Sequence, residues 1–267
     1  MLIGGFFLLP VIAFLTKAGL SPRAPKTRVE RKVLLRAGIL CGVLLFFASN
    51  LQQVGINLGS SVGKAAFLTD CYIMLVPILG IFLGRRCPRR VWFCVVLTLI
   101  GLYLLCITEN LTIQLSDLLL ILCALIFSGQ ILAIDHYAPI VDGLRLACLE
   151  FFVCGILTLL PMTFYEIIPA GGFAAWASSL TGWTVWGSLL YAGILSCGVA
   201  YTIQAVAQDE VNPTVASLIM SLESVFSTLS GWIVLHQMLT GRELLGCAII
   251  FCAVLLAQLP EHIFKNK

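Results

Sequence analysis

Long apolar runs, separated by short polar connections, follow one another along almost the whole chain. Nine of them approach the length of about 20 apolar residues that a membrane-spanning helix requires. They cover residues 1–16, 37–56, 65–83, 91–107, 118–134, 146–165, 183–207, 214–235 and 244–259. Within each run the apolar residues are continuous rather than alternating with polar ones, which favours helices over membrane strands. The pattern predicts an all-α protein: a polytopic membrane helix bundle of about nine transmembrane helices.

The composition agrees with a surface that faces lipid. Of the 267 residues, 60% are hydrophobic and 11% are charged, whereas a soluble domain carries about 25% charged residues. So few charged side chains cannot cover a water-facing surface, and the lipid bilayer is the expected surrounding. The 11 cysteines and three histidines lack the short paired spacings of a metal site. We expect no metal, no cofactor and no nucleic-acid partner.

The basic residues fall almost entirely on one side of the nine-span arrangement. Of the 16 basic residues, these lie on one side: Lys17, Arg23, Lys26, Arg28, Arg31, Lys32, Arg36, Arg85, Arg86, Arg89, Arg90, Arg145, Lys265 and Lys267. The other side has only Lys64 and Arg242. Because lysine and arginine are enriched in cytoplasmic loops, the basic side is predicted to be cytoplasmic. The chain is then a multi-pass protein of the cytoplasmic membrane with a cytoplasmic C-terminus.

Two parts of the chain repeat each other. The letters AGIL at 37–40 recur at 192–195, and GIFL at 80–83 aligns with GWIV at 231–234. The two copies begin five spans apart, and an odd separation turns the second copy upside down in the membrane. We predict a first repeat at 1–113 and a second at 114–267, which together form one membrane domain. Inverted repeats of this kind are typical of secondary transporters.

Two long segments carry a resemblance to a known family. They are SVGKAAFLTDCYIMLVPILGIFLGRRCPRRVW at 61–92 and GVAYTIQAVAQDEVNPTVASLIMSLESVFSTLSGWIVLHQ at 198–237. Their spaced small residues, glycines and prolines resemble the EamA-type family of the drug/metabolite transporter superfamily. The resemblance extends over nearly the whole chain and implies ten helices in two inverted five-helix halves, with both ends cytoplasmic. It also implies that a small solute, such as an amino-acid-like metabolite, is moved across the membrane.

The chain departs from that family pattern at two points. It has nine apolar runs where ten are expected, and the missing one would be the first, so we expect a chain that is N-terminally incomplete relative to such proteins. In the run 214–235, Ser224 stands where family members often have a proline after the acidic residue. Proline interrupts helical hydrogen bonding, so serine predicts a straighter helix here.

Three carboxylates lie well inside the apolar runs, where no lysine or arginine is found: Asp70, Glu150 and Glu223. A charge inside a bilayer costs about 2.5–3.5 kcal/mol on insertion scales and marks a functional path by default. Asp70 and Glu223 lie at similar depths in corresponding spans of the two repeats, which favours both as lining a central site. The alternative is a protonated carboxyl that bonds a neighbouring helix. We expect Glu150 to pair with Arg145 instead.

Uncharged polar side chains extend this candidate site. One face of the run 214–235 has hydroxyl side chains at helical spacing: Ser217, Ser221, Ser224 and Thr228. The predicted substrate-binding set comprises Glu223, Asp70, Gln53, Tyr201, Gln204, Ser221 and Ser224. For the uncharged members, close helix packing or interhelical hydrogen bonding is an equally good explanation.

Two pairs of glycines lie four residues apart within apolar runs. Gly38 with Gly42, and Gly80 with Gly84, form this GxxxG pattern. Small residues at this spacing let two membrane helices approach closely. We therefore expect tight helix packing at both pairs.

Three classes of function are compatible with a helical membrane bundle. The repeat favours a secondary transporter or facilitator that moves small polar or amphipathic metabolites by alternating access. A non-transporting membrane partner or sensor subunit stays open. An integral membrane enzyme is less favoured, because the chain has no GxSxG, HExxH or glycine-rich phosphate loop. We expect no enzymatic activity.

Overall fold

The computed structural model describes residues 1–19, 23–59, 62–85, 87–107, 114–236 and 240–258. Throughout these residues the chain is helical and has no strand, which confirms the all-α prediction. Seven helical segments in this part are long and apolar enough to cross a membrane, and Leu2–Lys17 is a shorter apolar helix. A helix bonds every backbone polar group within its own segment, which lipid requires. Residues 259–267, whose two lysines support the predicted orientation, lie outside the described residues.

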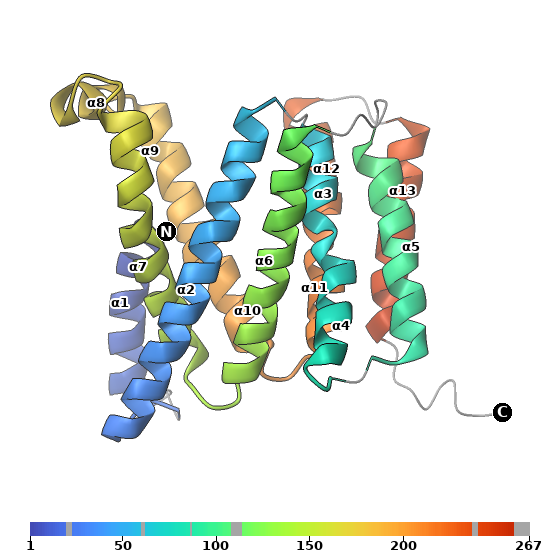
Figure 1. The fold of residues 1–267 in the computed structure, drawn as a ribbon, viewed down its shortest axis with the longest axis horizontal. Coiled ribbons are helices and arrows are strands. Elements are labelled where there is room, and N and C mark those ends of the chain that lie inside the picture. Colours follow the sequence, from blue (N-terminus) through green and yellow to red (C-terminus); the bar gives the residue numbers. More distant parts are fainter. Residues whose placement is uncertain (20–22, 60–61, 86, 108–113, 237–239, 259–267) are drawn as a thin grey trace. The chain divides into compact units, whose positions relative to one another are not determined.

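The chain folds into two compact units, each made of segments far apart in sequence (Figure 1). The first unit covers Met1–Phe47 and Ala133–Glu210, and the second covers Ala48–Leu132 and Val211–Lys267. Two long helices, α2 (Arg28–Asn57) and α6 (Leu115–Tyr137), contribute residues to both units. The predicted repeats 1–113 and 114–267 divide the chain differently, so each compact unit contains parts of both predicted repeats.

The first unit is built around α1 and α7. Besides its parts of α2 and α6, it contains α1 (Leu2–Lys17), α7 (Gly143–Met162), the π-helix η1 (Thr163–Ile167), α8 (Phe173–Ser179), α9 (Trp183–Leu190), the π-helix η2 (Tyr191–Tyr201) and α10 (Thr202–Ala207). Helix α1 packs against both α7 and η2. Helix α2 packs against α7 so closely that a Cβ on Gly42 would lie 2.6 Å from the Cβ of Val153. A Cβ on Gly38 would lie 2.6 Å from that of Leu149, which confirms tight packing at this pair.

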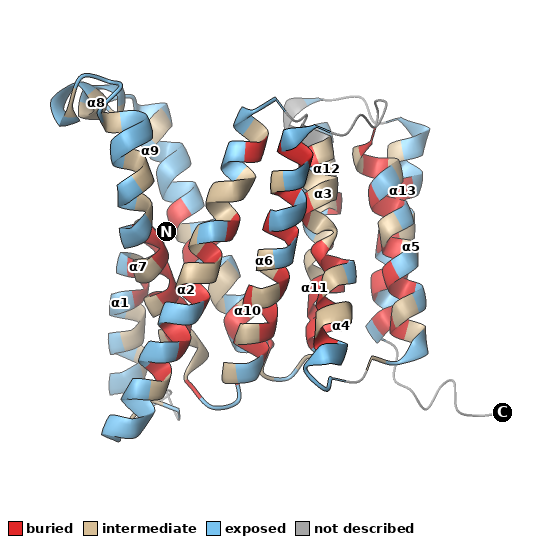
Figure 2. Ribbon diagram, viewed as in Figure 1, coloured by how far each residue is buried: buried red, intermediate tan, exposed pale blue. Residues whose placement is uncertain are grey.

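The second unit packs its helices around a continuous apolar core. Its helices, besides parts of α2 and α6, are α3 (Val62–Asp70), α4 (Tyr72–Phe82), α5 (Arg89–Cys106), α11 (Pro213–Met220), α12 (Leu222–Leu235) and α13 (Gly241–Gln258). Ile73, Leu102, Leu218 and Ile250 are completely buried in this core. Buried residues follow the length of α5 and α13, which pack against each other (Figure 2).

The second glycine pair does not support close helix packing. A Cβ on Gly80 would meet nothing nearer than 3.6 Å, and a Cβ on Gly84 would meet nothing within 4 Å. Gly84 follows the end of α4 and has a φ of +77°, the left-handed conformation that commonly ends helices. The prediction of tight packing at this pair is wrong, because Gly84 adopts the left-handed conformation that terminates α4 and does not lie in a helix–helix contact.

The two basic residues on the predicted non-basic side both contact side chains of the second unit. The ammonium of Lys64 donates a hydrogen bond to Asp117 at 2.7 Å, and both side chains are largely buried. The guanidinium of Arg242 lies 5.4 Å from the ring centroid of Tyr103. Both charges therefore have a partner close to them.

Large apolar side chains are exposed on helices of both units. Phe6, Phe82, Phe93 and Phe226 are each more than 59% exposed. A soluble monomer rarely exposes so many large apolar groups together, but lipid solvates them well. The exposed surface thus agrees with a multi-pass membrane protein.

Candidate functional site

The apolar segment that contains Asp70 is interrupted directly after this carboxylate. Helix α3 ends at Asp70, Cys71 forms a turn, and α4 begins at Tyr72. The N–H of Met74 donates to the carbonyl of Cys71, three residues earlier, at 3.0 Å. This tighter spacing departs from the α-helical ladder. The interruption places a carboxyl group at the end of a short helix within an apolar span.

The apolar segment that contains Glu223 is also interrupted. Helix α11 ends at Met220, Ser221 forms a turn, and α12 begins at Leu222. The hydroxyl of Ser221 donates to the carbonyl of Leu218 at 2.6 Å, and the N–H of Ser224 donates to the carbonyl of Ser221 at 3.2 Å. Serine hydroxyls that bond back to the preceding turn bend helices. The expectation of a straighter helix is therefore wrong, because serines interrupt it without a proline.

The two interruptions occupy corresponding places in the sequence repeat. Cys71 and Ser221 are 221 − 71 = 150 residues apart. The segments that begin at Gly80 and Gly231 are 231 − 80 = 151 residues apart. A carboxylate lies within two residues of each turn. The two segments that the sequence predicts to be copies of one repeat therefore share a local feature: a short helix, a turn and an acidic side chain beside it.

The fold brings the polar groups of the two interruptions together. The hydroxyl of Ser224 donates to Oδ2 of Asp70 at 2.7 Å, a length typical of a hydrogen bond to a charged acceptor. Glu223 directly precedes Ser224 in the first turn of α12. Asp70 and Ser224 are half-buried, Ser221 is buried and Glu223 is exposed. A carboxylate that accepts from a hydroxyl, with a second carboxylate next to that hydroxyl in the chain, offers oxygens that can bind a proton or a cationic group.

A glutamine adjacent to the predicted one extends this cluster. The side-chain amide of Gln52 donates to the hydroxyl of Thr69 at 3.4 Å, beside Asp70. Gln53, the predicted residue, donates instead to Asn57 one turn along its own helix at 3.2 Å. One residue turns the side chain by about 100° around a helix, so Gln52 and Gln53 face different neighbours.

Comparison of the chain with protein families identifies the family of the protein that contains this cluster. Residues 114–259 match the EamA-like transporter family, which is more than half of the 267 residues. The chain belongs to the EamA-like transporter family. Its members transport solutes, so this EamA-like protein is a multi-pass membrane transporter with a small-molecule solute as its partner.

Curated relatives agree with this family, and a solved structure shares the fold. The chain is 28% identical over 223 residues to an uncharacterized transporter of Archaeoglobus fulgidus, a match that covers 83% of this chain and 68% of the relative. It is 30% identical over 101 residues to the uncharacterized transporter YoaV of Bacillus subtilis, covering 38% of this chain and 32% of that protein. A crystal structure aligns with a TM-score of 0.68 at 18% identity, covering 99% of this chain and 98% of its own. At that identity it shows a shared fold.

The remaining predicted residues of this EamA-like protein, Tyr201 and Gln204, lie in its first unit. Tyr201 ends η2, and its ring packs edge-on against Phe151 with centroids 6.1 Å apart. Gln204 lies one turn later, in α10, and is half-buried. Asp70, Glu223, Ser221, Ser224 and Gln53 belong to the second unit. The substrate role of all seven residues stays a prediction.

Several further polar residues are buried in the described part of the transporter, among them one amide and two carboxylates within α6 and α7. Gln130 and Asp135 of α6 are 1% and 8% exposed, and Glu150 of α7 is 1% exposed. The amide of Gln130 interrupts an apolar run and could have been noticed on that ground. Asp135 was missed because the apolar run ends at residue 134, whereas α6 continues to Tyr137. Arg145, expected beside Glu150, contacts Thr16 at 2.8 Å and Asp142 at 3.7 Å.

The cysteines of the protein are free thiols, and most are buried. Among the described residues, no group of three or more His, Cys, Asp or Glu side chains is placed to hold a metal ion. Cys87 lies between α4 and α5, outside the membrane-spanning segments. Burial raises the pKa of its thiol, and a hydrogen bond with Thr214 partly offsets that rise in pKa.

Proposed function

We propose that this transporter moves small polar or amphipathic metabolites, of an amino-acid-like class, across the cytoplasmic membrane by alternating access. The observation that carries the proposal is the hydrogen bond of 2.7 Å between Ser224 and Asp70. It joins the interrupted segments of the two predicted repeats, with Glu223 directly before Ser224 in the chain. The predicted substrate site is centred on these three residues and includes Ser221.

The chemistry of the cluster favours a solute with an ammonium group. Asp70 and Glu223 lie in the apolar runs 65–83 and 214–235, neither of which contains a lysine or arginine, so a cationic group of the solute can balance their charge. The Ser224 hydroxyl donates to Oδ2 of Asp70, and an ammonium group can bind the same carboxylate through its other oxygen. Helix interruptions also release backbone carbonyls that can bind a cationic group, as in other carriers with discontinuous helices.

The inverted repeat supplies the mechanism in this proposal. Two similar segments of opposite orientation can exchange conformations, which exposes a site to one side of the membrane and then to the other. The predicted orientation places the basic connections and the C-terminus in the cytoplasm. A carboxyl such as Glu223 can take up a proton in one state and release it in the other, which would couple transport to a proton gradient.

Uptake by reconstituted liposomes tests the proposal. Full-length protein is reconstituted, and uptake of a panel of labelled amino acids and related amines is measured with and without a pH gradient. We expect saturable uptake of at least one class, which Asp70→Asn and Glu223→Gln reduce strongly. Glu210→Gln removes an exposed carboxylate that follows α10 and should leave uptake unchanged.

The assay also separates transport from the competing functions. Solute binding without uptake, measured by thermal stabilisation of the same purified protein, would favour a sensor or partner role. Conversion of a solute into a new product, detected by mass spectrometry, would favour an enzyme. Uptake that is equally fast in Asp70→Asn, Glu223→Gln and the wild type would refute the proposed site.

A further inference from the structure

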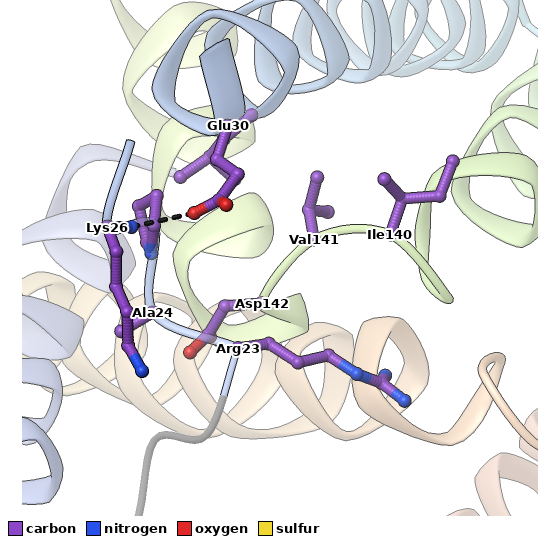
Figure 3. Close-up of a pocket in the computed structure, with 9 residues that line it drawn as sticks. Arg23, Ala24, Lys26, Glu30, Ile140, Val141 and Asp142 are labelled. Atoms are coloured by element: carbon purple, nitrogen blue, oxygen red, sulfur yellow. Dashed lines mark hydrogen bonds between the residues drawn. The ribbon is translucent and has the colours of Figure 1, made fainter. Parts of the chain in front are cut away.

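A cavity of about 310 Å³ lies within the first unit, at the ends of its helices. Its walls come from the connection before α2, the beginning of α2 itself, and the turn between α6 and α7 (Figure 3). Its size is at the lower end of the range of about 300–1,000 Å³ for small-molecule pockets. None of its lining residues belongs to the proposed substrate site.

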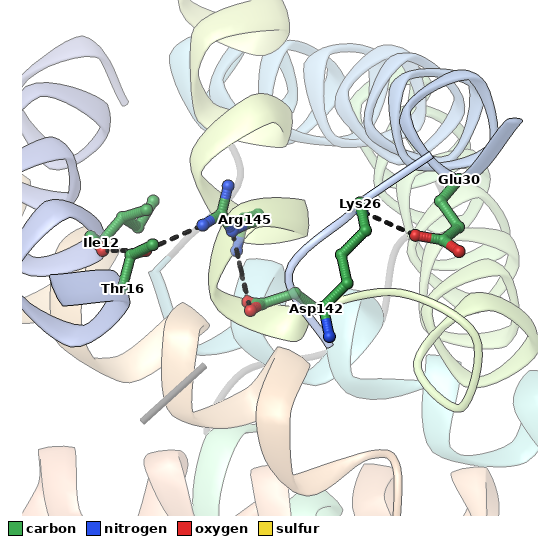
Figure 4. A network of polar contacts seen from close by, with 6 residues as sticks. All are labelled: Ile12, Thr16, Lys26, Glu30, Asp142 and Arg145. Carbon is green, nitrogen blue, oxygen red and sulfur yellow. Dashed lines mark hydrogen bonds and ion pairs between the residues drawn. The ribbon is translucent and has the colours of Figure 1, made fainter. Parts of the chain in front are cut away.

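The two carboxylates of this cavity both act as caps of helix N-termini. Glu30 accepts hydrogen bonds from the backbone N–H groups of Lys26, at 2.7 Å, and Thr27, at 3.3 Å. Asp142 accepts one from the N–H of Arg145 at 3.1 Å, which caps α7 (Figure 4). Capping carboxylates of this kind balance the partial positive charge of the helix end. Their negative charge is therefore largely compensated by the protein itself.

The positive charges of the cavity are less fully compensated by neighbouring groups than the two carboxylates are. Arg23 forms an ion pair with Asp209 and also donates to the carbonyl of Ala138 at 3.3 Å. The ammonium of Lys26 makes no hydrogen bond or ion pair within the described part of the chain, and its charge acts on Glu30 of the same cavity only as the smallest of several influences on that carboxylate. The first two turns of α2 add further exposed cations next to this cavity: Arg28, Arg31 and Lys32. The cavity therefore favours an anionic group.

Apolar side chains adjoin the same cavity. Leu34 and Ile140 contribute to its wall, and Ile140 is 57% exposed. Val29 and Leu35, on the same part of α2, are 70% and 50% exposed. An apolar border beside a basic pocket suits a ligand with a charged head and an apolar tail, and basic pockets at the ends of membrane helices bind anionic lipid headgroups.

We propose that this cavity binds the phosphate headgroup of an anionic phospholipid, with Lys26 as its main ionic contact. The acyl chains extend along the exposed apolar residues at the beginning of α2. A soluble phosphate would satisfy Lys26 but would leave the apolar border exposed, which is why the observations favour the lipid. The site is separate from the proposed transport function and does not depend on it.

Native mass spectrometry of the full chain in detergent tests this site, with phosphatidylglycerol, phosphatidylcholine and glycerol 3-phosphate as probes. The wild type should bind phosphatidylglycerol in preference to phosphatidylcholine. Lys26→Gln should weaken phosphatidylglycerol binding about fivefold, the order of effect of one basic side chain at an anionic lipid surface. Lys32→Gln removes an equal charge from α2 outside the cavity wall and should bind nearly as the wild type does.

Two results would overturn the proposal. Equal weakening in Lys32→Gln and Lys26→Gln would show diffuse attraction to the basic connection rather than a site. Displacement of the lipid by an equimolar amount of glycerol 3-phosphate would show a soluble phosphate ligand. Melting curves without lipid control for folding, and Lys26→Gln should melt nearly as the wild type does because the Lys26 side chain is exposed and makes no hydrogen bond or ion pair among the described residues.

Discussion

The hydrogen bond from Ser224 to Asp70 is the contact on which the proposed site depends, and a double-mutant cycle can measure it. The cycle compares Ser224→Ala, Asp70→Ala and the double variant with the wild type. Alanine removes the donor in one case and both acceptor oxygens in the other. The coupling free energy is the part of the double-variant effect that the two single effects do not explain.

The geometry sets the expected magnitude. At 2.7 Å the bond has the ordinary length of a hydroxyl–oxygen hydrogen bond, and hydrogen bonds to charged groups contribute about 1.5–3 kcal/mol in soluble proteins. In membrane proteins the measured couplings average about 0.6 kcal/mol and reach about 1.7, because the unfolded chain in the membrane also finds partners. Asp70 and Ser224 are half-buried, so we expect a coupling of about 1 kcal/mol, between these limits.

Reversible unfolding in mixed detergent micelles, followed by circular dichroism, provides the free energies. Ser227→Ala serves as the matched control, because Ser227 is an exposed hydroxyl in the same helix, α12. Its cycle with Asp70→Ala should be additive within about 0.3–0.5 kcal/mol. A coupling between Ser224 and Asp70 no larger than that of the control would refute the bond and remove the main support for the site.

Three further predictions concern packing, an ion pair and a thiol. Gly42→Ala should lower the free energy of unfolding by about 1–3 kcal/mol, because its Cβ would lie 2.6 Å from another Cβ. Gly129→Ala, which meets nothing within 4 Å, should have no such cost in the same unfolding assay. Lys64→Met should cost about 3 kcal/mol by leaving a buried carboxylate unpaired, and adding Asp117→Leu should recover most of it; no recovery would contradict this reasoning. Because burial raises the pKa of Cys87, a variant with this cysteine alone should react with iodoacetamide at a rate whose pH midpoint lies above that of a free thiol, and an unshifted midpoint would contradict that pKa direction.

The sequence alone was sufficient to predict the helical membrane fold and the family. Lipid offers no partner for backbone polar groups, so a long apolar run has to form a helix whatever its neighbours are. The positions of Asp70 and Glu223 in two similar segments were equally visible in the sequence. Charge within an apolar run is a property of the segment itself, so no contact had to be known.

The contacts of these side chains were decided by the tertiary structure. The sequence did not distinguish Gln52 from Gln53, and it predicted a straight helix where Ser221 forms a turn. It also assigned Gly84 to close packing, whereas this glycine follows the end of α4. In each case the outcome depends on which way a helix is rotated and where its hydrogen bonds stop. Neighbouring helices set both, since one residue changes the direction of a side chain by about 100° while the hydropathy of the segment stays the same.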